Sequence, residues 1–416
     1  MARITLVVPV FPKVSETFIV NKFLGLLATG HDVSIVAQRL DFAIWTHYPA
    51  LAALPGLRNR LLAIESEWSV SNLVRLAYRT LRVLVQRPHT LMRYLFRRWQ
   101  SLGPRALRHY WGDLAVISTS PDIVHFEFGS LAVAKAQLGR LLNCKIVVSF
   151  RGFDLNYAGL DSPGYYDGVW KHADAVHCLG EDLWKRAIDR GCPPRKEHAL
   201  IPPSIDSGLF APSQARDLDK IGSTERPLRL LSVGRLEWKK GYEYALAAVR
   251  ELLDQGLTVE YRIIGSGGFL EAIMFCRSQL RLGDSVRMLG SLGQAEIRQH
   301  MQWADVFLHA AVSEGFCNAV VEAQSMELPV VTSDADGLRE NVEDGVTGFV
   351  VARRDWRALA ERVRKLADDG QLRAEMGRAG RRRVCANFRL PQQIKAFDGL
   401  YRRVLETDSP ASGKVK

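Results

Sequence analysis

The sequence lacks the features that typify secreted or membrane-spanning proteins. Its six cysteines are scattered, without a CxxC pair or metal-ligand spacing, which disfavours a disulfide framework and predicts a reduced chain. No run of 18 apolar residues occurs, so we expect no membrane-spanning helix. The apolar residues 4–10 are interrupted by Pro9 and precede no small-residue cleavage site, so they indicate a buried strand rather than a signal peptide.

Acidic residues are absent from residues 68–112, although the whole chain of 416 residues carries 45 of them and a net charge of +11. Arginines at helical spacing and several aromatics fill this stretch, and Pro88 and Pro104 divide it into two or three amphipathic helices. Such basic helices are typical of anionic membrane surfaces. The arginines expected to contact the membrane are Arg75, Arg79, Arg82, Arg93, Arg97 and Arg98.

Two other interpretations of this basic stretch remain open. It could be a helical insertion packed on the first domain, with its arginines solvated or paired with acids. Nucleic-acid binding is the third, but no recognition motif supports it, and we expect no nucleic-acid partner. We favour the membrane surface, and we expect a cytoplasmic protein held peripherally at the inner face of the cell membrane.

Short apolar runs alternate with helix-length amphipathic segments along most of the chain, which predicts an α/β fold with parallel sheets. A polar stretch near the middle favours two such domains joined by a linker. We expect a first domain at 1–207 with a helical insertion at about 68–112, a linker at 208–227 and a second domain at 228–388. A helix at 389–406 should pack back on the first domain, before a disordered tail at 407–416.

The stretch SEGFCNAVVEAQSMELPVV begins at Ser313, after an expected strand at 306–309. Its carboxylates Glu314 and Glu322 flank the start of an expected helix at 318–326. Backbone N–H groups near Phe316, Cys317 and Asn318 would point out of that helix N-terminus, which attracts anions such as a diphosphate. A carboxylate accepts two hydrogen bonds from hydroxyls, so the layout suits a sugar nucleotide. Two solvated glutamates are the alternative.

Two glycine-containing loops follow expected strands in the same half of the chain. In VGRLEWKKGY, Gly234 allows a tight turn, and Arg235 with Lys240 offers two cations to one pair of phosphates. In IIGSGGF, Gly265 belongs to a turn that we expect to line the pocket for a nucleotide base. A basic surface loop is the alternative for the first motif. A phosphate cradle is the weaker alternative for the second, because the full dinucleotide fingerprint is missing.

The order of these motifs resembles glycosyltransferase family 4, a family of retaining enzymes with the GT-B architecture of two Rossmann-like domains facing a cleft. The resemblance implies that Arg235 and Lys240 hold the donor diphosphate. It further implies that Glu314 meets the sugar beside the N–H groups of residues 316–318, and that Glu322 binds the ribose. No cofactor and no metal would be needed, because cations and a helix N-terminus neutralise the leaving diphosphate.

The segment FPKVSETFI is similar to transferases that build bacterial exopolysaccharides and capsules, including the colanic-acid type. Ser15 is expected to cap a helix, with Glu16 and Thr17 in its first turn, and the resemblance places this loop beside the acceptor.

Two positions depart from the family pattern in the first half. Glu127 stands where relatives carry a second histidine, and Arg151 replaces the histidine of an H-G-F-D motif whose Asp154 is kept. Glu127 and Arg151 could pair at neighbouring strand ends, where open α/β sheets place ligand groups. We expect Glu127, Arg151 and Asp154, with Glu314, to be catalytic. A purely structural salt bridge between Glu127 and Arg151 remains an alternative.

Together these features predict a retaining, metal-independent hexosyltransferase. Its donor would be a UDP- or GDP-sugar, and its acceptor a glycan linked to polyprenyl diphosphate, in exopolysaccharide, capsule or lipopolysaccharide synthesis. A nucleotide-sugar epimerase of the same fold is one alternative. A catalytically silent, membrane-associated assembly protein is the other, because the departures at Glu127 and Arg151 allow it.

Overall fold

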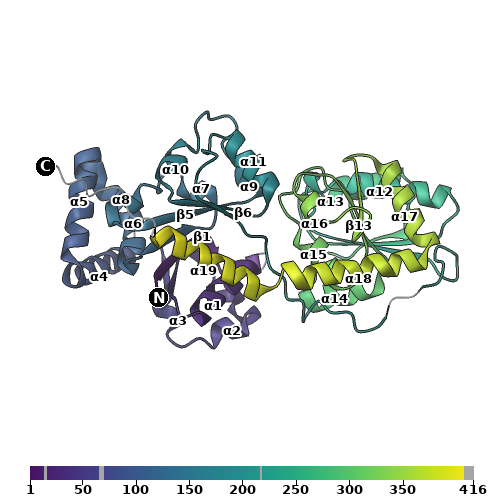
Figure 1. The fold of residues 1–416 in the computed structure, drawn as a ribbon, viewed down its shortest axis with the longest axis horizontal. Coiled ribbons are helices and arrows are strands. Elements are labelled where there is room, and N and C mark those ends of the chain that lie inside the picture. The colour runs from purple at the N-terminus through teal and green to yellow at the C-terminus, as the bar shows by residue number, and fades with distance from the viewer. Residues whose placement is uncertain (14–15, 65–69, 216–217, 407–416) are drawn as a thin grey trace. The chain divides into compact units, whose positions relative to one another are not determined.

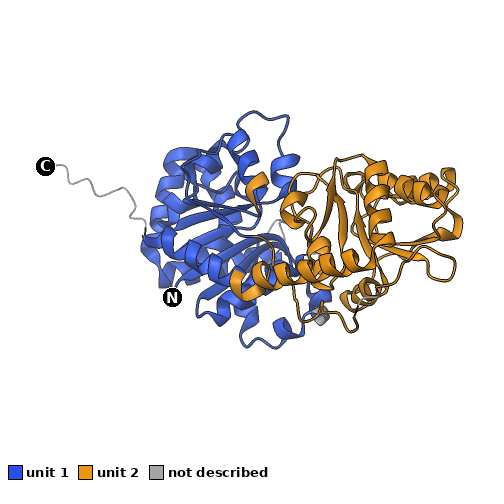
Figure 2. Cartoon of the chain, turned by 45° about the vertical axis from the view of Figure 1, so that its right-hand side comes forward, with its two compact units in different colours: residues 1–179, 183–201, 393–416 blue, residues 180–182, 202–392 orange. Residues whose placement is uncertain are grey.

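The computed structural model describes residues 1–13, 16–64, 70–215 and 218–406, and the chain forms two compact units (Figure 2). Unit 1 contains residues 1–179, 183–201 and 393 onward, and unit 2 contains residues 180–182 and 202–392. The predicted Ser15 cap and the expected tail at 407–416 lie outside the described residues.

Unit 1 is built on a seven-stranded parallel sheet with the order β3-β2-β1-β4-β5-β6-β7 (Figure 1). Its central strands are apolar and buried, as expected of a parallel sheet covered by helices on both faces. The strands are β1 (Arg3–Phe11), β2 (Asp32–Leu40), β3 (Leu61–Ala63), β4 (Ile123–Phe126), β5 (Lys145–Phe150), β6 (Ala175–Cys178) and β7 (His198–Leu200).

The helices of unit 1 include two long ones within residues 68–112, a third that begins there and one from the far end of the chain. They are α1 (Thr17–Ala28), α2 (Pro49–Ala52), α3 (Leu57–Arg60), α4 (Val70–Gln86), α5 (Pro88–Leu102), α6 (Ala106–Thr119), α7 (Gly129–Ala132), α8 (Leu138–Leu142), α9 (Gly152–Asn156), α10 (Asp167–His172), α11 (Glu181–Asp189) and α19 (Leu390–Glu406). Short 3-10 turns are η2 (Phe42–His47) and η3 (Gly103–Arg105).

Unit 2 is a six-stranded parallel sheet with the order β10-β9-β8-β11-β12-β13. Its strands are β8 (Leu228–Val233), β9 (Val259–Ile264), β10 (Val286–Met288), β11 (Val306–His309), β12 (Val330–Ser333) and β13 (Gly348–Val351). Its helices are α12 (Tyr242–Asp254), α13 (Leu270–Gln279), α14 (Gln294–Trp303), α15 (Asn318–Ser325), α16 (Leu338–Asn341), α17 (Trp356–Asp368) and α18 (Gly370–Asn387), with 3-10 turns η4 (Trp238–Lys240) and η5 (Gly283–Ser285).

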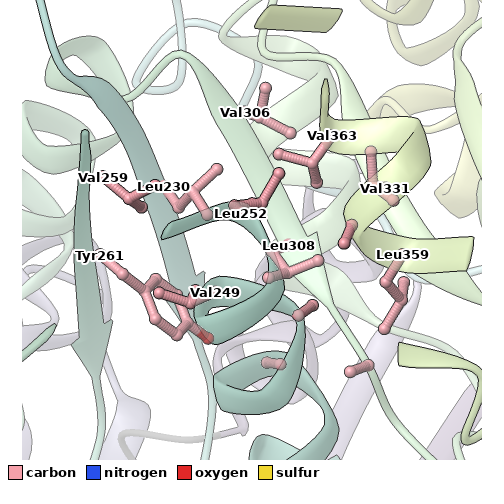
Figure 3. Close-up of a cluster of buried hydrophobic side chains, with 14 of the residues drawn as sticks. Leu230, Val249, Leu252, Val259, Tyr261, Val306, Leu308, Val331, Leu359 and Val363 are labelled. Atoms are coloured by element: carbon pink, nitrogen blue, oxygen red, sulfur yellow. The ribbon is translucent and has the colours of Figure 1, made fainter. Parts of the chain in front are cut away.

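The core of unit 2 shows why its strands are apolar along their whole length. Leu230 of β8 packs on one face of the sheet with residues of α12 and α17 (Figure 3). Its neighbour Leu231 packs on the other face with residues of α14 and α15. Successive side chains of a strand point to opposite faces, so both faces need apolar residues here.

The described residues of the segment expected to be a linker, 208–215 and 218–227, pack onto unit 2 instead of running free. The side chains of Phe210 and Ile221 are buried in the two cores of this unit. Ser325 donates a hydrogen bond to the carbonyl of Phe210 at 2.6 Å, and Arg373 donates to that of Asp219 at 2.7 Å. The division of the chain therefore falls at residues 201–202, earlier than the expected linker.

The last helix, α19, belongs to unit 1 from residue 393 onward. Its buried side chains include Phe397 and Tyr401, and Ile394 lies against Gly25 of α1. Among the described residues, no helix is both long and apolar enough to cross a bilayer.

Candidate functional site

Both sheets have the strand order of a doubly wound fold, with a switch point where the order reverses. Ligands of open α/β sheets bind at the carboxyl ends of the strands beside this point. In unit 2 the switch lies between β8 and β11, and the loops that follow these strands carry Gly234, Lys240 and Glu314. In unit 1 it lies between β1 and β4, and Glu127 directly follows β4.

The centre of the unit 2 site is an ion pair between Lys240 and Glu314, whose side chains are 11% and 13% exposed. Burial alone would raise the pKa of Glu314, but Lys240 and His309 lower it to about 2. Burial opposes a charged His309, yet Cys317 and Glu314 raise its pKa to about 9. Near neutral pH, two cations therefore surround one carboxylate, an arrangement suited to a phosphate group.

The backbone around Glu314 is held by Asp336. The Oδ2 atom of Asp336 accepts hydrogen bonds from Ser313 Oγ at 2.7 Å and from the Glu314 amide at 3.0 Å. The Gly337 amide in turn donates to the Glu314 carbonyl at 3.0 Å. These contacts fix the carboxylate of Glu314 relative to the start of α15.

The N-terminus of α15 differs from the expected anion cradle at one residue. Cys317 stands at the N-cap position, but its amide already donates to Asn341 Oδ1 at 3.1 Å. The prediction that this N–H group is free for a diphosphate is therefore wrong in this structure. Asn318 is the first helical residue, and the Phe316 ring lies 5.8 Å from that of Phe388.

Glu322 lies on the second turn of α15. Within the part of the chain that the structure describes, no side chain makes a hydrogen bond or ion pair with its half-buried carboxylate. Burial without a compensating cation raises the pKa of Glu322 to about 7. A carboxylate left in this state is a ready acceptor for ligand hydroxyls.

Gly234 and Gly265 bring the loops after β8 and β9 into close contact. Gly265 has φ +148°, and a Cβ atom there would lie 1.9 Å from the carbonyl oxygen of Gly234. Tyr242 donates to the same carbonyl at 2.9 Å. Arg235 extends outward, is 64% exposed at its side chain and pairs with Glu237 at 2.6 Å.

Three potential metal ligands, His309, Glu314 and Cys317, have ligand atoms within 4.8 Å of one another. Lys240 already forms an ion pair with Glu314, so its positive charge would repel a metal ion bound there. The acidic pair Asp334 and Asp336 is likewise engaged, by Arg353 at 3.5 and 3.4 Å. These contacts favour an anion over a metal ion at this site.

In unit 1, Glu127 is fully buried between two cations. Lys22 Nζ lies 2.5 Å from its Oε1 atom and Arg151 Nη2 lies 3.1 Å from its Oε2 atom. Burial raises the pKa of Glu127, but Lys22 and Arg151 bring it below its ordinary value. The geometry brings Glu127 and Arg151 together and favours the structural salt bridge, because the Glu127 carboxylate has no exposed surface and each of its oxygens contacts a cation.

A chain of buried polar groups continues from this ion cluster through the core of unit 1. Lys22 Nζ lies 3.1 Å from His125 Nδ1, which lies 2.7 Å from the Tyr401 hydroxyl. His125 Nε2 and His177 Nδ1 each lie 2.7 Å from Ser149 Oγ. Burial lowers the pKa of both histidines, so they are neutral links that tie α19 to the sheet.

Asp154 is buried at the start of α9, where its carboxylate accepts hydrogen bonds from backbone amides. Its two oxygens accept hydrogen bonds from the amides of Ser130 at 3.0 Å and Arg151 at 3.1 Å. Burial raises its pKa. Asp154 thus joins the loops after β4 and β5, and its catalytic role stays a prediction.

Comparison with known proteins decides the family. The family described as "Glycosyl transferases group 1" matches residues 213–383. Over 380 residues the chain is 30% identical to the colanic acid biosynthesis glycosyltransferase WcaL of Escherichia coli. The aligned region covers 85% of this chain and 87% of WcaL. This chain belongs to the group 1 glycosyltransferases. The resemblance to family 4 and to colanic-acid enzymes is confirmed.

Further comparisons agree with this assignment. This glycosyltransferase is 28% identical over 385 residues to the amylovoran biosynthesis glycosyltransferase AmsK of Erwinia amylovora, covering 86% of this chain and 88% of that protein. The sucrose-phosphate synthase of Thermosynechococcus elongatus matches with a TM-score of 0.71 at 18% identity, covering 98% of this chain and 100% of that one. Anabaena HepE, which was solved with UDP, matches with a TM-score of 0.71 at 14% sequence identity. The match covers 96% of this chain and 100% of HepE. The predicted fold of two Rossmann-like domains is confirmed.

The expected acceptor loop of this glycosyltransferase is only partly described, because Ser15 lies outside the described residues. Helix α1 begins at Thr17, with Glu16 at the N-cap position but without a side-chain cap hydrogen bond. Lys13 pairs with Glu16 at 2.6 Å. The acceptor role of this loop stays a prediction.

The arginines of the acid-free stretch divide into two groups. Arg75, Arg82 and Arg97 are exposed, whereas Arg79 and Arg93 are half-buried and donate to backbone carbonyls. Arg98 is 1% exposed and donates to Asp113 at 3.2 Å, within the packing of α5 on α6. The prediction that Arg98 contacts a membrane is therefore wrong, because its charge is neutralised inside unit 1.

Sequence reasoning missed Lys22, His309, Asp336 and Asn341. Lys22 had a visible signal, since it is the one charged residue of the apolar helix TFIVNKFLGLLA. His309 ends a buried strand, which is also a recognisable position for a ligand-binding group. Asp336 and Asn341 act on backbone amides of a loop more than 20 residues away, which no local pattern reveals.

Proposed function

We propose that this protein is a retaining, metal-independent hexosyltransferase of bacterial exopolysaccharide, capsule or lipopolysaccharide synthesis. Its donor is a UDP- or GDP-sugar, and its acceptor is a glycan on polyprenyl diphosphate at the inner face of the cell membrane. The polysaccharide role is supported by relatives that are named for colanic acid and amylovoran biosynthesis. The uridine nucleotide is supported by HepE, which was solved with UDP.

The observation that carries the proposal is the charge arrangement at the switch point of unit 2. Lys240 and His309 are cations beside the start of α15, and Glu322 is a carboxylate without a partner among the described residues. The diphosphate of the donor would meet the cations, and the ribose hydroxyls would meet Glu322. The charge that grows on the leaving diphosphate is then stabilised without a metal ion.

The test is transfer by the purified protein. UDP- and GDP-sugars are supplied with a lipid extract that contains polyprenyl-diphosphate glycans, in the presence of EDTA. We expect release of nucleoside diphosphate coupled to labelling of the lipid glycan, and a product whose anomeric configuration by NMR equals that of the donor. An inverted product would contradict retention, and a requirement for added metal would contradict metal independence.

The same assay separates the alternatives. An epimerase would interconvert nucleotide sugars without an acceptor, and an assembly protein would turn over no donor. The Glu314→Gln variant is the control for the charge arrangement of the unit 2 site. Glutamine keeps the size of the side chain but removes the charge that pairs with Lys240.

A further inference from the structure

Helix α4 turns an apolar stripe toward solvent. Its large exposed side chains recur every three or four residues and fall within an arc of about 140° on a helix with 100° per residue. Their exposed fractions are 44% or more. The stripe consists of Val70, Leu73, Val74, Tyr78, Leu81, Leu84 and Val85. An exposed apolar surface of this extent marks an interaction site.

The opposite face of α4 is firmly attached to unit 1. Val83 is 5% exposed, Thr80 Oγ1 lies 2.8 Å from the Tyr110 hydroxyl of α6, and Arg79 donates to the Ala63 carbonyl at 3.0 Å. The core-facing side of α4 therefore packs on unit 1, and the apolar stripe is a second face that the described residues leave uncovered.

Helix α5 repeats this arrangement beside α4. Leu91 and Tyr94 are buried toward α6, whereas Met92, Phe96 and Trp99 are 61%, 64% and 54% exposed. Both α4 and α5 pack on α6, and Figure 1 shows the three helices together in unit 1. The name α4–α5 stripe is used below for the seven apolar residues of α4 given above together with Met92, Phe96 and Trp99 of α5.

The charges around the stripe select the partner. Arg75 and Arg82 lie at one border of the stripe on α4, and both are exposed. Residues 68–112 contain no acid, and Asp113 is enclosed by Arg98, Tyr94 and Lys135. A protein partner would need only the apolar surface, whereas an anionic bilayer also uses bordering cations and amphipathic aromatic rings at the headgroup level.

We propose that the α4–α5 stripe inserts into the interfacial region of an anionic bilayer, with Arg75 and Arg82 at the level of the headgroups. This inference rests on the proposed membrane association and changes its physical basis. Attachment comes from burial of apolar side chains, with the arginines selecting anionic lipid, rather than from a row of arginines alone.

The test is sedimentation with vesicles of phosphatidylethanolamine and phosphatidylglycerol at 3:1, and with vesicles of phosphatidylcholine alone. The stripe variant carries Val74→Ser, Leu81→Ser and Val85→Ser, and the matched control carries Leu270→Ser, Met274→Ser and Phe275→Ser on α13. All six side chains are at least 40% exposed, so neither variant opens a core. We expect the stripe variant to lose about 10-fold or more of its binding to anionic vesicles, and the control to bind like the wild type.

Two further measurements make the outcome decisive. Brominated acyl chains should quench the fluorescence of Trp99, measured as the difference between the wild type and Trp99→Phe. Raised salt should weaken binding without abolishing it, because apolar burial is not screened. Loss of binding in Arg75→Gln with Arg82→Gln, together with full binding of the stripe variant, would overturn the insertion while leaving membrane association intact. Absence of vesicle binding by the wild type would overturn both. A wild-type dimer that the stripe variant converts to monomers would overturn the insertion alone, because the stripe would then be an interface between two copies of the chain.

Discussion

The side chains of Lys240 and Glu314 form a partly buried ion pair beside the first turn of α15, although their positions differ by 74 in the chain. If the proposed function holds, Glu314 positions the Lys240 ammonium for the departing diphosphate. The charge on a leaving diphosphate grows in the transition state, so a cation placed there stabilises that state more than the bound donor.

The first prediction concerns Lys240→Ala. We expect turnover to fall by on the order of 10²-fold, with a much smaller change in the dissociation constant of the nucleotide sugar. Initial rates over a range of donor concentrations, combined with calorimetry of donor binding, separate the two effects. A variant in which only the Michaelis constant rises would assign Lys240 to donor binding instead.

The second prediction concerns Glu322→Gln, which should stabilise the protein and weaken nucleotide binding together. Burial raises the pKa of Glu322 from 4.5 to about 7, so the folded protein keeps a proton that the unfolded chain releases between these values. The wild type therefore loses stability as pH rises from 4.5 to 7, by up to about 3 kcal/mol at 1.36 kcal/mol per pKa unit.

The measurement for Glu322→Gln is chemical denaturation at pH 4.5 and pH 8. The variant should gain stability over the wild type at pH 8 and little at pH 4.5. At pH 8 its affinity for nucleoside diphosphate should fall, at a cost of roughly 1.5–3 kcal/mol, because ribose hydroxyls lose a charged acceptor. Unchanged affinity would remove Glu322 from the ribose role.

The third prediction separates the structural and catalytic interpretations of Glu127. Because Glu127 lies between Lys22 and Arg151 without exposed surface, Glu127→Gln should lower the free energy of unfolding by about 3–5 kcal/mol. Replacing Lys22 with Met and Glu127 with Leu together should recover part of this loss, because one buried cation is removed with the carboxylate. A Glu127→Gln variant of wild-type stability whose turnover falls by on the order of 10²-fold would instead support the catalytic role.

The fourth prediction compares two glycines of the same loop. Gly265→Ala should lower the melting temperature and weaken nucleotide binding, because the new Cβ would meet the Gly234 carbonyl and φ +148° disfavours side chains. Gly268→Ala is the matched control, since a Cβ there meets no atom within 4 Å. Equal behaviour of the two variants in thermal unfolding would show that the loop relaxes around Gly265 at no cost.

The sequence predicts the fold well where its strands are buried on both faces. The expected strand at 306–309 matches β11 residue for residue, and the buried strand expected at 4–10 lies within β1. The strands β3 and β7 lack such a signal, because three residues are too few to show an apolar run. In the stretch expected to be a linker, Phe210 and Ile221 are single apolar residues that pack into the cores of unit 2, and isolated apolar residues give no periodic signal.

The sequence indicated only those residues of the candidate site whose type and position in a motif stand out. Spacing and resemblance indicated Glu314, Glu322 and Lys240, which the structure places in unit 2 near the ends of its strands or on α15. The occupation of the Cys317 amide by Asn341 and the burial of Arg98 depend on residues distant in the chain or on neighbouring helices. Periodicity describes one helix at a time, so it cannot say which arginine of a basic helix faces a carboxylate.

The membership of α19 in unit 1 has a consequence for the order in which the protein forms on the ribosome. Unit 1 starts with the first strand, yet one hydrogen-bond partner of its buried His125 is Tyr401, which is translated after the whole of unit 2. Until that helix emerges, the apolar surface under Phe397 and Tyr401 stays uncovered. Unit 2, whose residues are contiguous apart from a three-residue segment, can complete its fold earlier, so the domain that is made first is finished last.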